Sequence, residues 1–173
     1  RTQRYIEWLQ EGKFVAGQTL EIINDSDSFA VVDGGYGFGQ TIGPQAVQLG
    51  IDKAAQTGVS IIALRRSGHL GRIGDWAEMA AAANQVSIHF VNVAGSQLVA
   101  PFGGSGRRMA TNPIAIGLPL ADQAPLILDF ATALVAEGKV LVAHNGGKPL
   151  PEGSLVTADG QLTTDPHHLY GDT

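Results

Sequence analysis

The sequence predicts an α/β fold in which a mixed sheet is flanked by helices. Short apolar runs rich in β-branched residues, typical of buried strands, alternate with segments whose apolar residues recur at helical spacing. From residue 29 to residue 93 the order is strand, helix, strand, helix, strand, which is typical of right-handed parallel crossovers. Two later apolar runs, 114–118 and 126–130, are joined by a short loop that would allow an antiparallel hairpin. The two kinds of pairing together predict a mixed sheet.

The composition is typical of a folded globular protein. The chain has 173 residues, of which 44% are hydrophobic and 16% charged, so it is long enough for one domain with a core. Its net charge of -5 argues against a nucleic-acid partner, and no apolar run approaches the roughly 20 residues that a membrane helix needs. Cysteine is absent, and residues 1–5 lack the apolar core of a signal peptide. We therefore expect a cytoplasmic protein without disulfides.

Both ends of the sequence suggest a truncated chain. The first residue is Arg1 rather than methionine, residues 1–10 already have a helical pattern, and residues 160–173 form a polar tail. We expect a fragment of a larger subunit. The alternative is a processed chain that is complete as it stands.

The first predicted helix covers residues 1–10 and ends near Gly12. A strand is predicted at 29–33, followed by a glycine-rich segment at 34–40. Neither the dinucleotide fingerprint nor the P-loop fingerprint is satisfied there or in the chain's other glycine clusters. We therefore predict a tight turn with two packed aromatic residues rather than a phosphate loop. The apolar face of the helix is formed by Tyr5, Ile6, Trp8 and Leu9.

The second predicted helix follows this turn. Pro44 suits its first turn and Gly58 suits its end. The spacing of its apolar residues predicts a buried face made of Val47, Ile51, Ala54 and Ala55.

The most informative stretch is Ser-Gly-His-Leu-Gly-Arg-Ile-Gly at 67–74. It follows a strand predicted at 59–64 and precedes a helix predicted at 76–84. His69 thus lies on a glycine-rich turn at the exit of a strand, where ligands commonly bind in α/β proteins. The apolar face of the helix is expected to comprise Ile73, Ala77, Ala80 and Ala81.

The next predicted strand covers residues 86–93. Its polar residues Ser87, His89 and Asn92 do not share one face, so we expect the strand to be covered on both sides. His89 is then best interpreted as a structural histidine.

Loops and caps complete the prediction. A loop is predicted at 101–108 and a turn at 111–113. Thr132 is expected to cap a helix at 133–139, and the chain is predicted to be loop beyond Gly146.

Three kinds of chemistry are compatible with these residues. Hydride transfer to or from a 2-hydroxy acid needs a base, a cation for the carboxylate and amides for cofactor phosphates. His69, Arg72, the glycine loop at 103–106 and the pair Arg107–Arg108 could supply them.

The second kind of chemistry is hydrolysis by a nucleophile that is assisted by a base and an orienting carboxylate. The candidates for these roles are Ser67, His69 and Asp129. No G-x-S-x-G elbow surrounds either Ser67 or Ser105, which disfavours hydrolysis. A metal site is the third, from Asp165, His167 and His168, but their spacing fits no structural template and we expect no metal.

Several motifs, taken in order, carry a resemblance that spans nearly all of the chain. The stretches concerned are 37–40, 67–74, 99–104, 111–113, 128–132 and, in the next turn, 160–166. In these stretches the sequence resembles the malate/L-lactate dehydrogenase family of NAD(P)-dependent oxidoreductases. Within that family it looks most similar to the hydroxycarboxylate dehydrogenase branch, on residues 71–78 and 87–91.

The resemblance implies a fold unrelated to the Rossmann type, which agrees with the missing dinucleotide fingerprint. It implies hydride transfer between NAD or NADP and C2 of a small 2-hydroxy or 2-keto acid such as malate or lactate, with His69 as the acid/base residue. It also implies a homodimer, which we would seek at Tyr5, Trp8 and Leu9. The residues implied to bind the cofactor are Ser67, Ser96, Gly103, Gly104, Thr111, Asn112, Asp129, Phe130 and Ala131, with Thr132 completing the last segment.

The resemblance also suggests the domain organisation: an N-terminal helix and linker at 1–24, a NAD(P)-binding and catalytic core at 25–145, and a loop-rich C-terminal segment at 146–173. The family's Ser-His-Gly motif is not in this chain, and Arg1 is expected to be the arginine that follows it, with a role in binding substrate. Smaller departures are Ala110 and Ala133, where the family commonly has glycine and serine. The alternative is a non-catalytic binding or scaffold fragment of such an enzyme.

Overall fold

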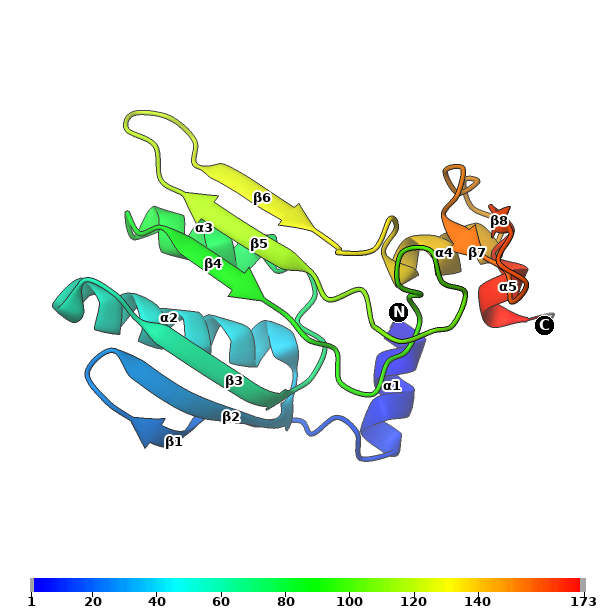
Figure 1. Cartoon of the computed structure of the whole chain (residues 1–173). Coiled ribbons are helices and arrows are strands. Elements are labelled where there is room, and N and C mark those ends of the chain that lie inside the picture. Colours follow the sequence, from blue (N-terminus) through cyan, green and yellow to red (C-terminus); the bar gives the residue numbers. More distant parts are fainter. Residues whose placement is uncertain (1, 172–173) are drawn as a thin grey trace. The chain divides into compact units, whose positions relative to one another are not determined.

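The computed structural model describes residues 2–171, and of Thr2 only the backbone (Figure 1). Contacts divide the chain into two units, which we describe separately. The first unit comprises the residues up to His89 together with Ala115–Leu128, and the second comprises Phe90–Ile114 and the residues from Asp129 onward. The helices are α1 (Thr2–Gln10), α2 (Gly39–Thr57), α3 (Gly74–Ala82), α4 (Glu137–His144) and α5 (His167–Tyr170). The strands are β1 (Glu21–Asp25), β2 (Phe29–Gly37), β3 (Ile61–Ser67), β4 (Ser87–Phe90), β5 (Ile114–Leu118), β6 (Leu126–Phe130), β7 (Leu155–Val156) and β8 (Leu162–Thr163).

The first sheet has the order β1-β2-β3 and is mixed, but its antiparallel pair is β1–β2 rather than the predicted pair of strands at 114–118 and 126–130, which lies in another sheet. β1 pairs with β2 antiparallel, and β2 pairs with β3 parallel through the crossover helix α2. Ala30 and Val32 of β2 are fully buried, and they cluster with Ala46 of α2. This cluster is the core of the first sheet.

β1 corrects the prediction, because it lies where only a linker was expected. All of its residues are exposed, so its sequence has no alternating pattern that would reveal a half-buried strand. It exists as an edge strand because β2 offers it a partner, with Glu21 opposite Asp33.

The tight turn predicted at 34–40 is also wrong, because β2 continues to Gly37 and α2 begins at Gly39. The register between β2 and β3 shifts after Asp33 and resumes at Gly37, which lies opposite Ser67. Such a bulge lets the strand continue through glycines that sequence patterns assign to a turn. Pro44 consequently lies inside α2 rather than in its first turn.

The buried face predicted for α2 is wrong as well. Val47, Ile51 and Ala54 are only partly buried and Ala55 is exposed. The difference arises because the helix starts earlier than predicted and its buried residues lie in its first turns. The predicted end is confirmed: Gly58 is left-handed (φ 83°) and its N–H donates to the carbonyl of Ala54. The buried residues of α2 are Gly39, Ile42, Gly43 and Ala46.

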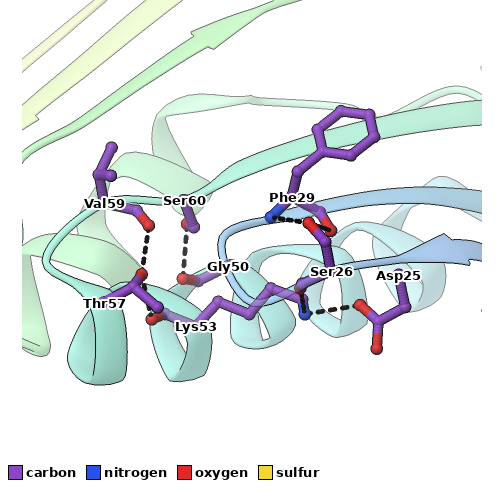
Figure 2. Close-up of polar contacts among 8 residues, drawn as sticks. All are labelled: Asp25, Ser26, Phe29, Gly50, Lys53, Thr57, Val59 and Ser60. Atoms are coloured by element: carbon purple, nitrogen blue, oxygen red, sulfur yellow. Dashed lines mark hydrogen bonds and ion pairs between the residues drawn. The ribbon is translucent and has the colours of Figure 1, made fainter.

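Polar contacts fasten the end of α2 to the sheet (Figure 2). Lys53 has a side chain only 12% exposed, and its Nζ donates to the carbonyl of Ser26 and contacts Asp25 Oδ1, both at 2.6 Å. Ser60 Oγ donates to the carbonyl of Gly50 at 2.7 Å. These bonds join the β1–β2 turn and the start of β3 to the same helix.

α3 and its buried face are confirmed: Ile73, Ala77, Ala80 and Ala81 are all buried. β5 packs directly on this helix, because a Cβ on Gly117 would lie 2.5 Å from the carbonyl oxygen of Ala77. Close helix–strand approach of this kind requires glycine.

The second sheet has the order β4-β5-β6, and β5 and β6 run in opposite directions, as expected for the predicted hairpin (Figure 1). Two expectations fail here. β4 belongs to this sheet rather than to that of β3, and it is not covered on both sides, since Ile88 is 56% and Phe90 is 75% exposed. Sheet membership depends on tertiary pairing, which the order of elements along the chain does not fix.

The second unit contains more regular structure than predicted. α4 begins at Glu137, so Thr132 does not cap it, and its N-cap is Ala136. The segment after Gly146, predicted to be loop, contains the paired strands β7 and β8 and the short helix α5. Along the described part of the chain, no helix combines the length and apolarity that crossing a bilayer requires.

Candidate active site

His69 lies two residues after the end of β3, in the first unit, where the sequence placed it. Its Nδ1 atom is 2.8 Å from the hydroxyl of Tyr5 on α1, and the two rings are 6.0 Å apart between centroids. An imidazole held in this way at a strand end can exchange a proton with a bound molecule.

The glycines around His69 permit backbone-to-backbone packing. The N–H of Gly68 donates to the carbonyl of Gly37 at 2.9 Å, and a Cβ on Gly68 would lie 2.6 Å from that oxygen. A Cβ on Gly39 would lie 2.7 Å from the Cα of Leu70, and Gln40 Nε2 donates to the Leu70 carbonyl at 2.5 Å. Two motifs that are separate in the sequence, 37–40 and 67–74, therefore pack against each other at the candidate acid/base residue.

An aromatic cluster surrounds Tyr5. Its ring centroid is 5.7 Å from those of Trp8 and Phe38 and 5.9 Å from that of Phe14. Tyr5 and Trp8, proposed from sequence as a dimer face, are thus engaged within the chain. On the same helix, Leu9 is 44% exposed.

A buried carboxylate anchors the strands that lead to His69. Asp33 is 1% exposed and accepts hydrogen bonds from Arg66 Nε at 2.7 Å and Arg65 Nε at 2.8 Å. The hydrogen bond from Arg66 lowers the pKa of Asp33 to about 2, and the hydrogen bonds from the Gly35 N–H and Arg65 act in the same direction. This carboxylate therefore stays ionised across the physiological range.

The backbone is strained at the same place. Arg66 and Tyr36 both have positive φ, 48° and 58°, which is uncommon for residues with a Cβ. The Arg66 guanidinium carbon lies 5.8 Å from the Tyr36 ring centroid, within the range of a cation–π contact. The bonds to Asp33 hold this conformation just before Ser67 and His69.

Two other residues near His69 have partners of their own. Arg72, a candidate for binding the substrate carboxylate, forms ion pairs with Asp75 at 2.5 Å and Glu78 at 2.6 Å, and these raise its pKa. Ser67 Oγ donates to the carbonyl of Gly68 at 3.1 Å. Asp129, the third member of the hydrolase alternative, belongs to the second unit.

A hollow of about 330 Å³ lies in the second unit. Asn112 Oδ1, on its rim, accepts from the N–H of Val93 at 3.1 Å. Thr132 Oγ1 lies within 3.1 Å of the carbonyls of both Thr111 and Asn112, and the Thr132 N–H donates to Thr111 O at 2.9 Å. The structure thus brings the 111–113 turn and the segment after β6 together. The lining residues are Phe90, Val91, Asn92, Asn112, Pro113, Ile114 and Thr132.

The other predicted cofactor residues of the second unit lie on connecting segments or at the end of β6. Ser96 is partly buried and its N–H donates to Val93 O at 3.4 Å. Gly103 is left-handed (φ 76°) and Gly104 closes the same turn by donating to Pro101 O at 2.9 Å. Asp129 and Phe130 end β6 with exposed side chains, and Ala131 follows them partly buried.

Three remaining sequence candidates are placed as follows. Arg1 lies outside the described residues. His89 Nε2 is 3.0 Å from Ser87 Oγ, and burial lowers the pKa of this histidine. His167 Nδ1 contacts Asp165 Oδ1 at 2.7 Å, and the described residues contain no cluster of three or more histidines and carboxylates that could hold a metal ion.

The contact of Tyr5 with the candidate acid/base residue is a feature that sequence reasoning missed. The helical spacing around Tyr5 predicts an apolar helix face, where a tyrosine is usually a packing residue. Its contact with His69 joins residues 64 positions apart, which no local pattern reveals.

Comparison with known proteins matches residues 1–172 to the malate/L-lactate dehydrogenase family. The chain belongs to this family. It is 43% identical over 162 residues to hydroxycarboxylate dehydrogenase B of Escherichia coli O157:H7, a match that covers 94% of this chain and 45% of that protein. It is also 43% identical over 150 residues to an L-lactate dehydrogenase of Cupriavidus necator, covering 86% of this chain and 43% of the relative.

The fold agrees with solved structures. Sulfolactate dehydrogenase from Methanocaldococcus jannaschii superposes with a TM-score of 0.83 at 36% identity, covering 98% of this chain and 48% of that one. The chain therefore spans a little under half the length of the relatives it matches.

Proposed function

We propose that the complete protein moves a hydride between a nicotinamide cofactor and C2 of a small 2-hydroxy or 2-keto acid. The observation that carries the proposal is the position of His69: a member of a dehydrogenase family presents an imidazole at a strand end, held by the Tyr5 hydroxyl at 2.8 Å. His69 is the acid/base residue in this proposal.

The chemistry balances with one proton and one hydride. When bound, the nicotinamide supplies or takes the hydride at C2 of the acid. In the oxidation direction His69 takes the proton of the C2 hydroxyl, so that the C–O single bond becomes a carbonyl. In the reduction direction protonated His69 returns that proton to the carbonyl oxygen. A histidine suits both directions because its ordinary pKa lies near neutral pH.

The second unit has a feature that fits part of a nicotinamide nucleotide. The hollow beside Asn112 is about 330 Å³, within the usual size range of ligand sites, and apolar side chains such as Phe90 and Ile114 form much of its wall. Asn92, Asn112 and Thr132 supply the polar part of its lining, and the Thr132 hydroxyl donates to the carbonyl of Asn112. We propose that the second unit holds the cofactor through residues of the core at 25–145, namely Ser96, Gly103, Gly104, Thr111, Asn112, Asp129, Phe130 and Ala131. Ser67 of the first unit is proposed as a further cofactor residue.

Several finer assignments belong to the same proposal. Arg1 binds the substrate carboxylate, since a guanidinium matches its two oxygens. The substrate is a hydroxycarboxylate of the malate or lactate type, the cofactor is NAD or NADP, and the enzyme is a homodimer in the cytoplasm. Substrate and cofactor are decided together by assaying a panel of 2-keto acids with both reduced cofactors.

The test is the kinetics of His69→Ala in the complete protein. Loss of a positioned acid/base residue should lower kcat roughly 10²- to 10⁴-fold. The matched control is His168→Ala, which removes an exposed imidazole of the second unit and should leave kcat unchanged. A His69→Ala enzyme with near-normal kcat would contradict the role.

Binding is tested separately by titrating NADH and NADPH and following nicotinamide fluorescence. A saturable signal with at least one of them is expected from the unaltered protein. Its absence with both would favour the alternative, a folded scaffold without cofactor.

A further inference from the structure

Tyr5 contacts His69 through its hydroxyl rather than by stacking. The oxygen is 2.8 Å from Nδ1, whereas the ring centroids are 6.0 Å apart and the planes are inclined by 42°. A phenol can donate to an unprotonated ring nitrogen or accept from a protonated one. It is therefore able to stay with Nδ1 while the imidazole gains or loses a proton.

The ring of Tyr5 is itself fixed by its neighbours. The ring of Phe38 meets the Tyr5 ring edge-on at 86°. The ring centroids of Trp8 and Phe14 each lie within 5.9 Å of the Tyr5 centroid. Phe14 is only 6% exposed, and its N–H donates to the carbonyl of Trp8 at 3.1 Å. A ring packed on several sides can hold its hydroxyl in one position, as a supporting residue must.

The backbone on both sides of His69 is fixed as well. Gly68 donates to Gly37 O, and Leu70 O accepts from Gln40 Nε2. These bonds fix the main chain before and after the histidine but do not act on the rotation of its imidazole. The Tyr5 contact acts on that rotation.

We propose that Tyr5 is a positioning residue for His69: its hydroxyl holds Nδ1 and thereby assigns proton exchange with the substrate to the opposite ring nitrogen, Nε2. This inference rests on the proposed function, because it concerns the same histidine. It adds the atom that reacts and the residue that selects it.

The chemical consequence concerns the tautomer. Neutral His69 can take a proton at Nε2 only when its single hydrogen is on Nδ1, where the Tyr5 oxygen accepts it. After the transfer both nitrogens carry hydrogen and the Nδ1–H bond to Tyr5 remains. Without the hydroxyl, Nδ1 loses the oxygen that accepts its hydrogen in this tautomer.

The experiment is Tyr5→Phe in the complete protein, with Tyr170→Phe as the matched control. Tyr170 also uses its hydroxyl, which donates to Glu137 Oε1 at 2.6 Å in the second unit. Tyr5→Phe should lower kcat roughly 10- to 100-fold, as loss of a partner that orients an imidazole commonly does, with little change in KM. The limb of the pH profile of kcat/KM that reports His69 should shift. Tyr170→Phe should leave kcat, KM and the pH profile of kcat/KM unchanged.

Nitrogen NMR of the His69 ring gives a readout independent of turnover. In the unaltered protein above the pKa of the ring, Nδ1 should carry the hydrogen and Nε2 should not. In Tyr5→Phe the two tautomers should mix. The opposite tautomer in the unaltered protein, or an unchanged spectrum and pH profile in Tyr5→Phe, would overturn the inference.

The two proposals fail differently. If His69→Ala keeps its kcat, the proposed function fails. If His69→Ala is inactive while Tyr5→Phe matches Tyr170→Phe in rate, pH profile and spectrum, only the positioning role fails.

Discussion

The two units hold their candidate site residues by different means. In the first unit, His69 follows a strand whose end is anchored by buried Asp33, and its backbone packs against Gly37 and Gly39 without intervening side chains. In the second unit, Thr111 and Asn112 lie on a connecting turn, tied by the hydroxyl of Thr132, itself exposed. A group that transfers a proton needs fixed geometry, whereas turns that line a ligand tolerate adjustment. The comparison predicts unequal sensitivity to substitution.

The largest effect is expected at the glycine contact of the first unit. In Gly68→Ala the new Cβ would lie 2.6 Å from the carbonyl oxygen of Gly37, with the Phe14 ring also in its way. Because backbone and a buried ring would have to shift, the free energy of unfolding should fall by about 2–3 kcal/mol. The measurement is denaturant unfolding followed by circular dichroism.

The control for this substitution lies in the second unit. In Gly106→Ala the nearest atoms are those of the Arg108 guanidinium, 3.5 Å or more away. The free energy of unfolding should change by no more than about 0.5 kcal/mol. Equal losses in the two variants would contradict the contrast between the units.

A smaller and pH-dependent effect is expected from Asp33. Its pKa is about 2 in the folded chain, below its ordinary 3.8, because Arg66, Gly35 and Arg65 stabilise the ionised form. A lowered folded-state pKa gives stability that is present above the unfolded pKa and lost on acidification. Stability should therefore decline as the pH falls from about 4 to about 2.

Asp33→Asn identifies the source of this acid sensitivity. The variant should be less stable than the unaltered chain at neutral pH, and its stability should change less between pH 4 and pH 2. Thermal melts at several pH values measure both. Parallel pH curves for the two proteins would show that other carboxyl groups are responsible.

The smallest effect is expected at matched threonines, one in each unit. Thr132→Val removes the hydroxyl that contacts Thr111 O and Asn112 O, and Thr57→Val removes one that donates to Lys53 O and Val59 O. Each should lower the free energy of unfolding by about 1 kcal/mol. Calorimetry measures this loss.

The two threonine variants should differ in cofactor affinity. Thr132→Val should weaken nicotinamide nucleotide binding about fivefold, the equivalent of about 1 kcal/mol, because the hollow loses part of its rim. Thr57→Val should leave the Kd unchanged. If both variants bind NADH and NADPH like the unaltered protein, the hollow beside Asn112 is not part of the cofactor site.

Local patterns predicted many of the elements. The helical spacing of Ile73, Ala77, Ala80 and Ala81 identified the buried face of α3, and short apolar runs identified β5 and β6. The same kind of reasoning failed for β1, whose residues are all exposed, and for the glycines of β2, which continue a strand through a bulge. A pattern reveals an element when its apolar residues form a short run or recur at helical spacing. It fails where pairing alone creates the element.

By itself, the sequence determined the α/β class, the position of His69 at a strand exit and, through ordered motifs, the family. These properties depend on residue types at short spacing, which the chain carries locally. Only the tertiary structure decided that β4 pairs outside the first sheet, that Asp33 forms ion pairs with two arginines, and that the Tyr5 hydroxyl contacts Nδ1 of His69. Contacts between distant residues depend on how the elements pack, and no spacing along the chain records that.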